Sequence, residues 1–329
     1  MAIRDTMMTT QEGRGRFKLA LPKGTGLVWV LVGLCVVATF LSPSFLNAVN
    51  VTNVMRQVAL FGIVSVGMTF VILTKGIDLS VGSILGVCAV ATALLLADGW
   101  PVSAVVGVVL LAGVAMGALN GLGITFGGIP PFIMTLGTMV MGRGLALTLA
   151  NGQPVGLGSR AADFMWLGRG AMLGVPVPVW IFAIVAAAAI YVLRYTAYGR
   201  QIYAVGSNAE AAHLSGIDVG LTTFSVYVVS GFLASLTALI FVSRLTVGEP
   251  TAGTGIELEA IAITVIGGTS LFGGEGGIVG TIIGAGILAV LANIMNLLGI
   301  SPFTQQIVKG AIIIGALLYE MLGKRRERH

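Results

Sequence analysis

Apolar stretches long enough to cross a lipid bilayer follow one another along almost the whole of this chain. A helix needs about 20 apolar residues to span the hydrocarbon core. Hydrophobic residues make up 56% of the 329 residues and charged residues only 9%, which excludes a soluble domain of this length. The sequence therefore predicts an all-α, polytopic membrane protein. About ten transmembrane segments are expected, at 25–42, 53–74, 79–97, 102–122, 130–150, 177–195, 219–243, 256–271, 277–298 and 303–322.

The number of spans is open at two places. Only four residues separate segment 53–74 from segment 79–97, and segment 256–271 is short for a span. Eight or nine true spans with a re-entrant pair would also fit, because non-helical backbone is tolerated at membrane depth where protein shelters it.

Small residues repeat every four positions in three places, a spacing that lets helix backbones approach closely in lipid. The repeats are Gly113, Gly117 and Gly121; Gly276, Gly280 and Gly284; and Gly82 with Gly86. We expect them to mark packing within the chain rather than between subunits.

The positive charges indicate how the chain is oriented. Lys and Arg gather in cytoplasmic loops, and with the N-terminus inside the two faces divide them twelve to four. Both termini are then cytoplasmic, and the net charge of +5 reflects orientation rather than nucleic-acid binding. The inner set is Arg4, Arg14, Arg16, Lys18, Lys23, Lys75, Arg194, Arg200, Lys324, Arg325, Arg326 and Arg328. The outer set is Arg56, Arg160, Arg169 and Arg244.

One polar island, residues 198–218, interrupts the apolar segments on the inner side. Within it Ser207 and Glu210 have the spacing of a capping box, and Gly216 sits where a helix would end on a left-handed residue. The pattern predicts a self-capped helix of roughly 8 residues and about 12 Å. A short exposed helix of this kind offers no catalytic pair but can fit the groove of another protein.

This island resembles the coupling helix of permease subunits of bacterial ABC importers, in the branch that carries ribose and related monosaccharides. Two further motifs are similar to that family: K-G-I-D-L-S-V-G-S over 75–83 and the Gly-rich run 253–277. The likeness covers about 43–322 without a large insertion.

The resemblance implies a division of the chain into three parts. Residues 1–24 would be a cytoplasmic N-terminal tail, 25–322 a single transmembrane permease domain of the type II-like importers, and 323–329 a cytoplasmic basic tail. The coupling helix would lie at about 207–216. The residues expected to couple to the ATPase are Gly199, Arg200, Gly206, Ser207, Asn208, Glu210, Ala211, Ala212, Ser215 and Gly216.

The resemblance also implies partners. Two ABC ATPase subunits would bind ATP and Mg²⁺, so this chain needs no cofactor and is not itself an enzyme. A periplasmic binding protein would deliver the sugar, and a second permease, identical or similar, would complete the path through the inner membrane of the bacterium. We expect Arg56, Arg160, Arg169 and Arg244 to face the binding protein. The residues expected along the path are Asn120, Arg143, Asn293 and Asn296.

The alternative is an ion-coupled secondary sugar transporter. That mechanism needs a carboxylate or a broken-helix ion site near the midplane, whereas the acidic residues, including Asp78, Glu257 and Glu259, are expected at span ends or in loops. The Gly-rich run lacks the G-K-[S/T] ending of a nucleotide-binding loop. His213 and His329 are too far apart in sequence to indicate a metal site.

Overall fold

The computed structural model describes residues 25–327; the predicted N-terminal tail and residues 328–329 lie outside this part. The helices are α1 (Thr25–Leu41), α2 (Ala48–Leu73), α3 (Val81–Ala97), α4 (Val102–Thr125), α5 (Pro131–Leu149), η1 (Gly158–Arg160), α6 (Ala161–Phe164), α7 (Trp166–Arg169), α8 (Val177–Tyr195), α9 (Ala197–Ser207), α10 (Ala209–Leu214), α11 (Val219–Leu245), α12 (Ile256–Ile266), α13 (Ile278–Leu297) and α14 (Pro302–Glu327). The short strands are β1 (Val155–Gly156), β2 (Ala171–Met172), β3 (Val175–Pro176) and β4 (Val247–Gly248).

Each predicted transmembrane segment overlaps one of these helices. Six helices in the described part are long and apolar enough to cross a membrane by themselves: α2, α4, α5, α8, α11 and α13. Helices α1 and α3 are apolar but shorter, and α12 has only 11 residues. Helix α14 continues to Glu327, so the predicted boundary at residue 322 falls inside a helix.

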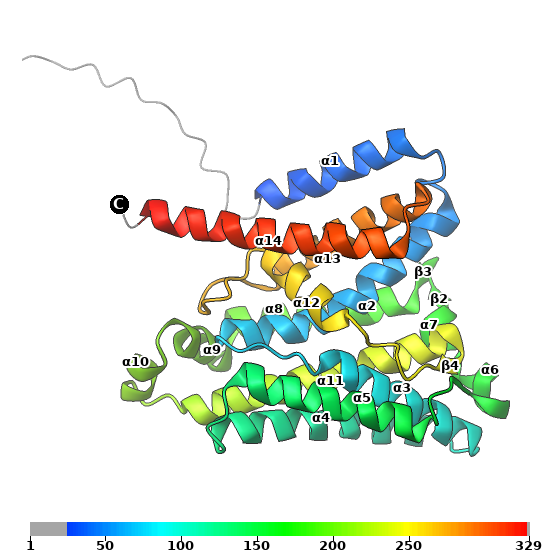
Figure 1. The fold of residues 1–329 in the computed structure, drawn as a ribbon, viewed down its shortest axis with the longest axis horizontal. Coiled ribbons are helices and arrows are strands. Elements are labelled where there is room, and N and C mark those ends of the chain that lie inside the picture. Colours follow the sequence, from blue (N-terminus) through cyan, green and yellow to red (C-terminus); the bar gives the residue numbers. More distant parts are fainter. Residues whose placement is uncertain (1–24, 328–329) are drawn as a thin grey trace, which may run out of the picture.

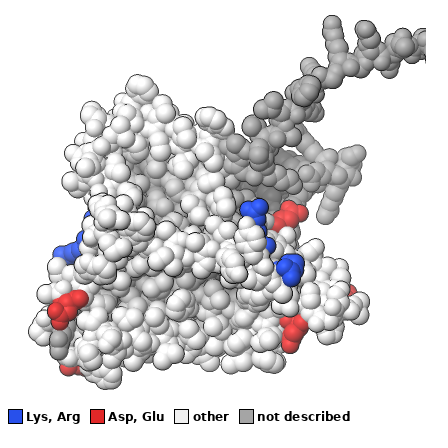
Figure 2. Space-filling model, turned by 180° about the vertical axis from the view of Figure 1, so that it is seen from behind, with Lys and Arg blue, Asp and Glu red and all other residues white. Residues whose placement is uncertain are grey.

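The long helices lie side by side and give the bundle two distinct ends (Figure 1). Helices α9 and α10, the start of α1 and the end of α14 share one end, and α6, α7, β2 and β3 occupy the other. We call these the α10 end and the α6 end. Figure 2 shows that the charged side chains on one face gather toward the two ends and leave a broad uncharged band between them. This is the charge distribution expected of a surface in contact with lipid tails.

Helices α4 and α11 pack closely because glycines line their contact. A Cβ at Gly113 would lie 2.5 Å from the carbonyl oxygen of Gly231, and one at Gly117 would collide with the carbonyl oxygen of Tyr227. The predicted packing of the Gly113, Gly117 and Gly121 repeat within the chain is confirmed. Without glycine, the two backbones could not come this close.

The Gly82 and Gly86 repeat contacts a segment of consecutive turns rather than a helix. After β4, residues 249–255 run back along α3, where the Pro250 carbonyl oxygen would be 2.9 Å from a Cβ at Gly86. A Cβ at Gly82 would overlap the carbonyl oxygen of Gly253. These contacts shelter a non-helical backbone between helices, the condition under which such backbone is tolerated at membrane depth.

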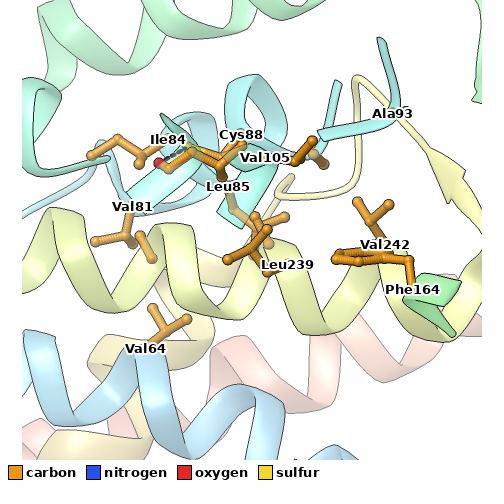
Figure 3. Close-up of a cluster of buried hydrophobic side chains, with 14 of the residues drawn as sticks. Val64, Val81, Ile84, Leu85, Cys88, Ala93, Val105, Phe164, Leu239 and Val242 are labelled. Carbon is orange, nitrogen blue, oxygen red and sulfur yellow. Dashed lines mark hydrogen bonds between the residues drawn. The ribbon is translucent and has the colours of Figure 1, made fainter. Parts of the chain in front are cut away.

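The α6 end is closed by the connection between α5 and α8. Strand β1 pairs antiparallel with β4, and β2 pairs with β3 in a hairpin. Phe164 of α6 is buried against Val242 of α11, at the edge of the apolar cluster that joins α3 and α11 (Figure 3). The predicted outer loop is therefore folded onto the bundle.

The α4–α11 contact predicts a strong difference between two glycines of one helix. We expect Gly117→Val to destabilise the protein by about 1–3 kcal/mol or more, because the added side chain meets the α11 backbone. Gly107→Val is the control, since a Cβ there meets nothing within 4 Å. Thermal unfolding in detergent measures the difference, and equal melting temperatures for both variants would contradict the packing described.

Candidate functional site

The polar island folds into two helices joined by one extended residue. Helix α9 begins at the Thr196 cap, whose side chain accepts a hydrogen bond from Gly199 N at 3.1 Å. Asn208 then adopts an extended conformation with φ −152° and ψ 106°, and α10 follows. Gly199 is buried against the carbonyl groups of α8, whereas Arg200 is exposed.

The predicted capping box at Ser207 and Glu210 is wrong by one residue. Asn208 caps α10, because its Oδ1 accepts a hydrogen bond from Ala211 N at 3.1 Å. Ser207 is the last residue of α9 and has helical backbone, so it cannot take the extended conformation that an N-cap requires. Glu210 lies in the first turn of α10, where its negative charge interacts favourably with the positive end of the helix dipole. Helix α10 has 6 residues rather than 8.

The predicted end of this helix at Gly216 is confirmed. Gly216 has φ +81°, the left-handed region that favours glycine. Gly216 N donates to the carbonyl of His213 at 2.9 Å, and Ile217 N donates to the carbonyl of Ala212 at 3.0 Å. This pair of hydrogen bonds is the Schellman motif, with Ser215 as the C-cap.

Helix α10 presents most of its side chains outward at the α10 end of the bundle (Figure 1). Glu210, Ala211 and His213 are exposed, and the apolar Leu214 is 81% exposed. Ala212 is only 4% exposed and faces its own chain. Of the two alanines predicted to meet a partner, Ala211 alone is positioned to do so.

Gly206 brings three separate parts of the chain into contact. A Cβ there would overlap the Leu73 carbonyl oxygen at the end of α2 and lie 2.6 Å from Gly274 N in the Gly-rich loop. Gly274 N donates to that same Leu73 carbonyl at 3.0 Å. The end of α9, the end of α2 and the loop between α12 and α13 therefore form one close contact, which we call the Gly206 joint.

Two longer side chains reinforce the Gly206 joint. Lys75, which has φ +63°, donates from Nζ to the Ser207 carbonyl at 3.0 Å. Tyr203 donates from its hydroxyl to the Gly276 carbonyl at 2.9 Å. Burial raises the pKa of the Tyr203 phenol, so this group keeps its proton and remains a donor. The segment α9–α10 is thus tied to both adjoining loops.

Residues 74–80 between α2 and α3 hold a buried carboxylate. Asp78 is 0% exposed; its Oδ1 accepts from Ser80 N at 3.0 Å and Ser80 Oγ at 2.6 Å, and its Oδ2 from Ser230 Oγ at 2.7 Å. The expectation that Asp78 is solvated at a span end is wrong. These three donors satisfy both oxygens of the buried carboxyl group.

The predicted path residue Asn120 belongs to this same network. Its Nδ2 donates to Ser80 Oγ at 2.7 Å, and its Oδ1 accepts from Thr138 Oγ1 at 2.7 Å. With no exposed surface, Asn120 ties α4 to the start of α3.

The four predicted path residues are not brought together. Asn293 and Asn50 exchange two amide hydrogen bonds, of 2.7 and 3.0 Å, and Asn296 accepts from Gln305 Nε2 at 2.7 Å. Arg143 lines a cavity of about 640 Å³ and donates from Nη2 to Glu257 Oε1 at 2.8 Å.

Two acidic residues of this cavity lie at the start of their predicted span, as expected, but this start is buried rather than solvated. Glu257 and Glu259 lie in the first turn of α12, which begins after the left-handed Gly255 within the bundle rather than at its end. Glu259 Oε2 accepts from Lys309 Nζ at 2.6 Å. The signal in the sequence was the short length of the apolar segment 256–271 and the glycines that precede it, which together indicate a helix that starts inside the bundle.

Three of the four predicted outer arginines gather at the α6 end. Arg169 Nε donates to the Arg244 carbonyl at 2.7 Å, and Arg56 Nη2 donates to the Arg169 carbonyl at 3.4 Å. Arg160 belongs to η1, and its side chain lies outside the described part of the structure. These arginines fasten the connection between α5 and α8 to α2 and α11 as well as presenting positive charge.

Comparison with known proteins identifies the family to which this chain belongs. Residues 50–317 match the family described as the permease component of the branched-chain amino acid transport system. The chain is 47% identical to the ribose import permease protein of Escherichia coli K12, over 95% of this chain and 99% of the relative. It is 46% identical to the ribose import permease protein of Bacillus subtilis, over 87% of this chain and 89% of the relative.

A more distant relative is the xylose transport system permease protein of Escherichia coli K12, 36% identical over 86% of this chain and 87% of the relative. No solved structure matches the chain. Because the family match covers most of the sequence, the chain belongs to this family of permease components and is a membrane-spanning transport subunit, not an enzyme.

Proposed function

We propose that the chain is the membrane subunit of an ATP-driven importer for a ribose-like monosaccharide. The proposal rests on the names of the two ribose permeases, one of which is matched over almost its whole length. The more distant xylose permease is also named for a pentose. In this proposal a periplasmic binding protein delivers the sugar, and partner ATPase subunits hold ATP and Mg²⁺.

The proposed mechanism rests on one observation: helix α10 is exposed, and the segment α9–α10 is in contact with the ends of interior elements of the bundle. Helix α10 docks in a groove of the ATPase, with Ala211 and Leu214 on its outward side. When ATP closes the two ATPase subunits, each α10 is carried along. The Gly206 joint then passes this movement to the end of α2 and to the Gly-rich loop. A dimer of permeases, identical or similar, encloses the path.

In this proposal the α10 end is cytoplasmic and the α6 end faces the periplasm. The asymmetry of Lys and Arg supports the orientation. Ten membrane-crossing segments of the type II-like arrangement follow if α1, α3, α12 and α14 join the six long apolar helices. Arg56, Arg160, Arg169 and Arg244 then lie on the periplasmic side, where they can meet acidic groups of the binding protein.

The alternative, an ion-coupled transporter, was disfavoured because carboxylates were expected only at span ends. That reason fails, since Asp78, Glu257 and Glu259 lie inside the bundle. All three are hydrogen-bonded or ion-paired to the protein, as structural carboxylates are. Similarity to permeases that import ribose supports the ABC importer.

Ala211→Arg tests the docking of α10. We expect normal membrane insertion, because α10 is not a span, but loss of ATP-dependent ribose uptake by the reconstituted complex. The bulky cation would not fit a groove shaped for a small side chain. Stimulation of ATPase activity by sugar-loaded binding protein should be lost as well.

Ala197→Arg is the matched control, because Ala197 is also exposed but lies at the far end of α9 from α10. It should retain most uptake and most of the stimulation. Normal transport by Ala211→Arg would mean that α10 is an ordinary loop and would remove the proposed coupling.

Single cysteines test the orientation. In a Cys35→Ala, Cys88→Ala background, Ser159→Cys at the α6 end should react with a membrane-impermeant thiol reagent in intact spheroplasts. Ala209→Cys on α10 should react only after permeabilisation. Both positions are exposed, so access to the side of the membrane decides the labelling. The opposite pattern would reverse the proposed topology.

A further inference from the structure

The cavity of about 640 Å³ around the start of α12 has an unusual wall for a membrane protein. It is formed by α2, α5, α11, α13 and α14 together with residues 252–262, and its volume lies within the range of about 300–1,000 Å³ typical of small-molecule sites. Five charged side chains line it. One is Arg244, in the last turn of α11, and the other four come from three helices: Arg143 of α5, Glu257 and Glu259 of α12, and Lys309 of α14.

These four charges lie at membrane depth. Arg143 is six residues before the end of α5 and Lys309 seven residues after the start of α14, so each lies about 10 Å inside its helix end. Their side chains are 36% and 25% exposed. Partly exposed cations at such depth are expected to face a water-filled cavity rather than lipid.

Two of the three cations that line the cavity are each matched by a carboxylate. Arg143 and Glu257 are joined at 2.8 Å, and Lys309 and Glu259 at 2.6 Å. A charged or zwitterionic ligand would have to break these pairs where desolvation makes separation costly. Hydroxyl groups can instead bond to the donors that remain on Arg143 and Lys309 while both pairs persist. This ion-paired part of the wall therefore favours a neutral, hydroxyl-rich molecule.

The remaining lining suits the ring of a sugar. Phe61 and Phe241 supply aromatic surface for the C–H face, and Gln306 and Thr254 supply uncharged hydrogen-bonding groups. Small-molecule sites commonly combine apolar lining with a few polar groups of this kind.

We propose that this cavity is the transit site for the monosaccharide, with the Arg143–Glu257 and Lys309–Glu259 pairs as its polar walls. The assignment rests on the proposed sugar-import function and adds the place where the permease itself contacts the sugar. It makes Lys309, Glu257 and Glu259 contact residues, in addition to Arg143.

Gly310 allows the cavity to be filled without disturbing the fold. It lines the cavity, and a Cβ there meets nothing within 4 Å. Gly315 of the same helix is equally open but does not line the cavity, so Gly315→Leu is the matched control. In proteoliposomes containing the full complex, Gly310→Leu should lower ribose uptake about tenfold or more, because Leu occupies space that the ring needs.

In the same preparation, ATPase activity stimulated by loaded binding protein should stay within about twofold of the parent level, because the Gly206 joint and α10 are unchanged. Gly315→Leu should retain both activities. Unchanged uptake by Gly310→Leu, or a parallel loss of uptake and stimulated ATPase, would overturn the assignment. Failure of the parent complex to take up ribose would instead reject the proposed function.

A second measurement does not depend on transport. In the Cys35→Ala, Cys88→Ala background, excess free D-ribose should slow modification of the Gly310→Cys thiol by a small hydrophilic thiol reagent. It should not slow modification of Gly315→Cys. L-leucine, a zwitterion, should protect neither thiol. Protection of Gly310→Cys by L-leucine but not by D-ribose, or by neither, would overturn the assignment to a neutral sugar.

Discussion

The α10 end of this molecule depends on the absence of a side chain at Gly206. Because no Cβ is present, the end of α9 reaches the Leu73 carbonyl and Gly274 N at the same point. Leu73 ends a helix that runs through the bundle, and Gly274 belongs to the loop that connects α12 and α13. The Lys75 and Tyr203 hydrogen bonds extend this contact on either side. A short surface segment is thereby connected directly to two interior elements, the arrangement that an externally driven transport subunit needs.

The second constraint is the need to accommodate polar backbone where the helices are interrupted. Three non-helical segments are held in different ways. Segment 74–80 is held by Asp78 and its serine partners, and segment 249–255 packs on Gly82 and Gly86. In segment 267–277, Gly274 N bonds to the Leu73 carbonyl. The break before α12 places Glu257 and Glu259 within the bundle, and their pairing with Arg143 and Lys309 gives the cavity two ion-paired walls. Broken helices thus supply both the mechanical connections and the lining of the proposed path.

Much of the fold could be predicted from the sequence. The helix positions follow from the lengths of the apolar segments, and the close contact of α4 at Gly113 and Gly117 follows from the small size of glycine. The position of the α9–α10 segment also followed from its polarity, but one helix was predicted where the structure has two. Asn208 rather than Ser207 caps α10, because Ser207 is the last residue of α9. The pairings Arg143–Glu257, Lys309–Glu259 and Asn50–Asn293 join residues 50 to 243 positions apart, and no local pattern indicates them. The burial of Asp78 was missed because a charge between two apolar segments resembles an exposed turn.

The central claim is that α10 and the Gly-rich loop move as one body. Spin labels on Ala209→Cys and Glu275→Cys would report the distance between them, and a second pair on Ala209→Cys and Val108→Cys in α4 would report movement against the bundle. These positions are exposed. Pulsed electron paramagnetic resonance on the full complex, with and without ATP, should show a constant first distance and a changed second one. A first distance that changes with nucleotide while the second stays constant would contradict the claim.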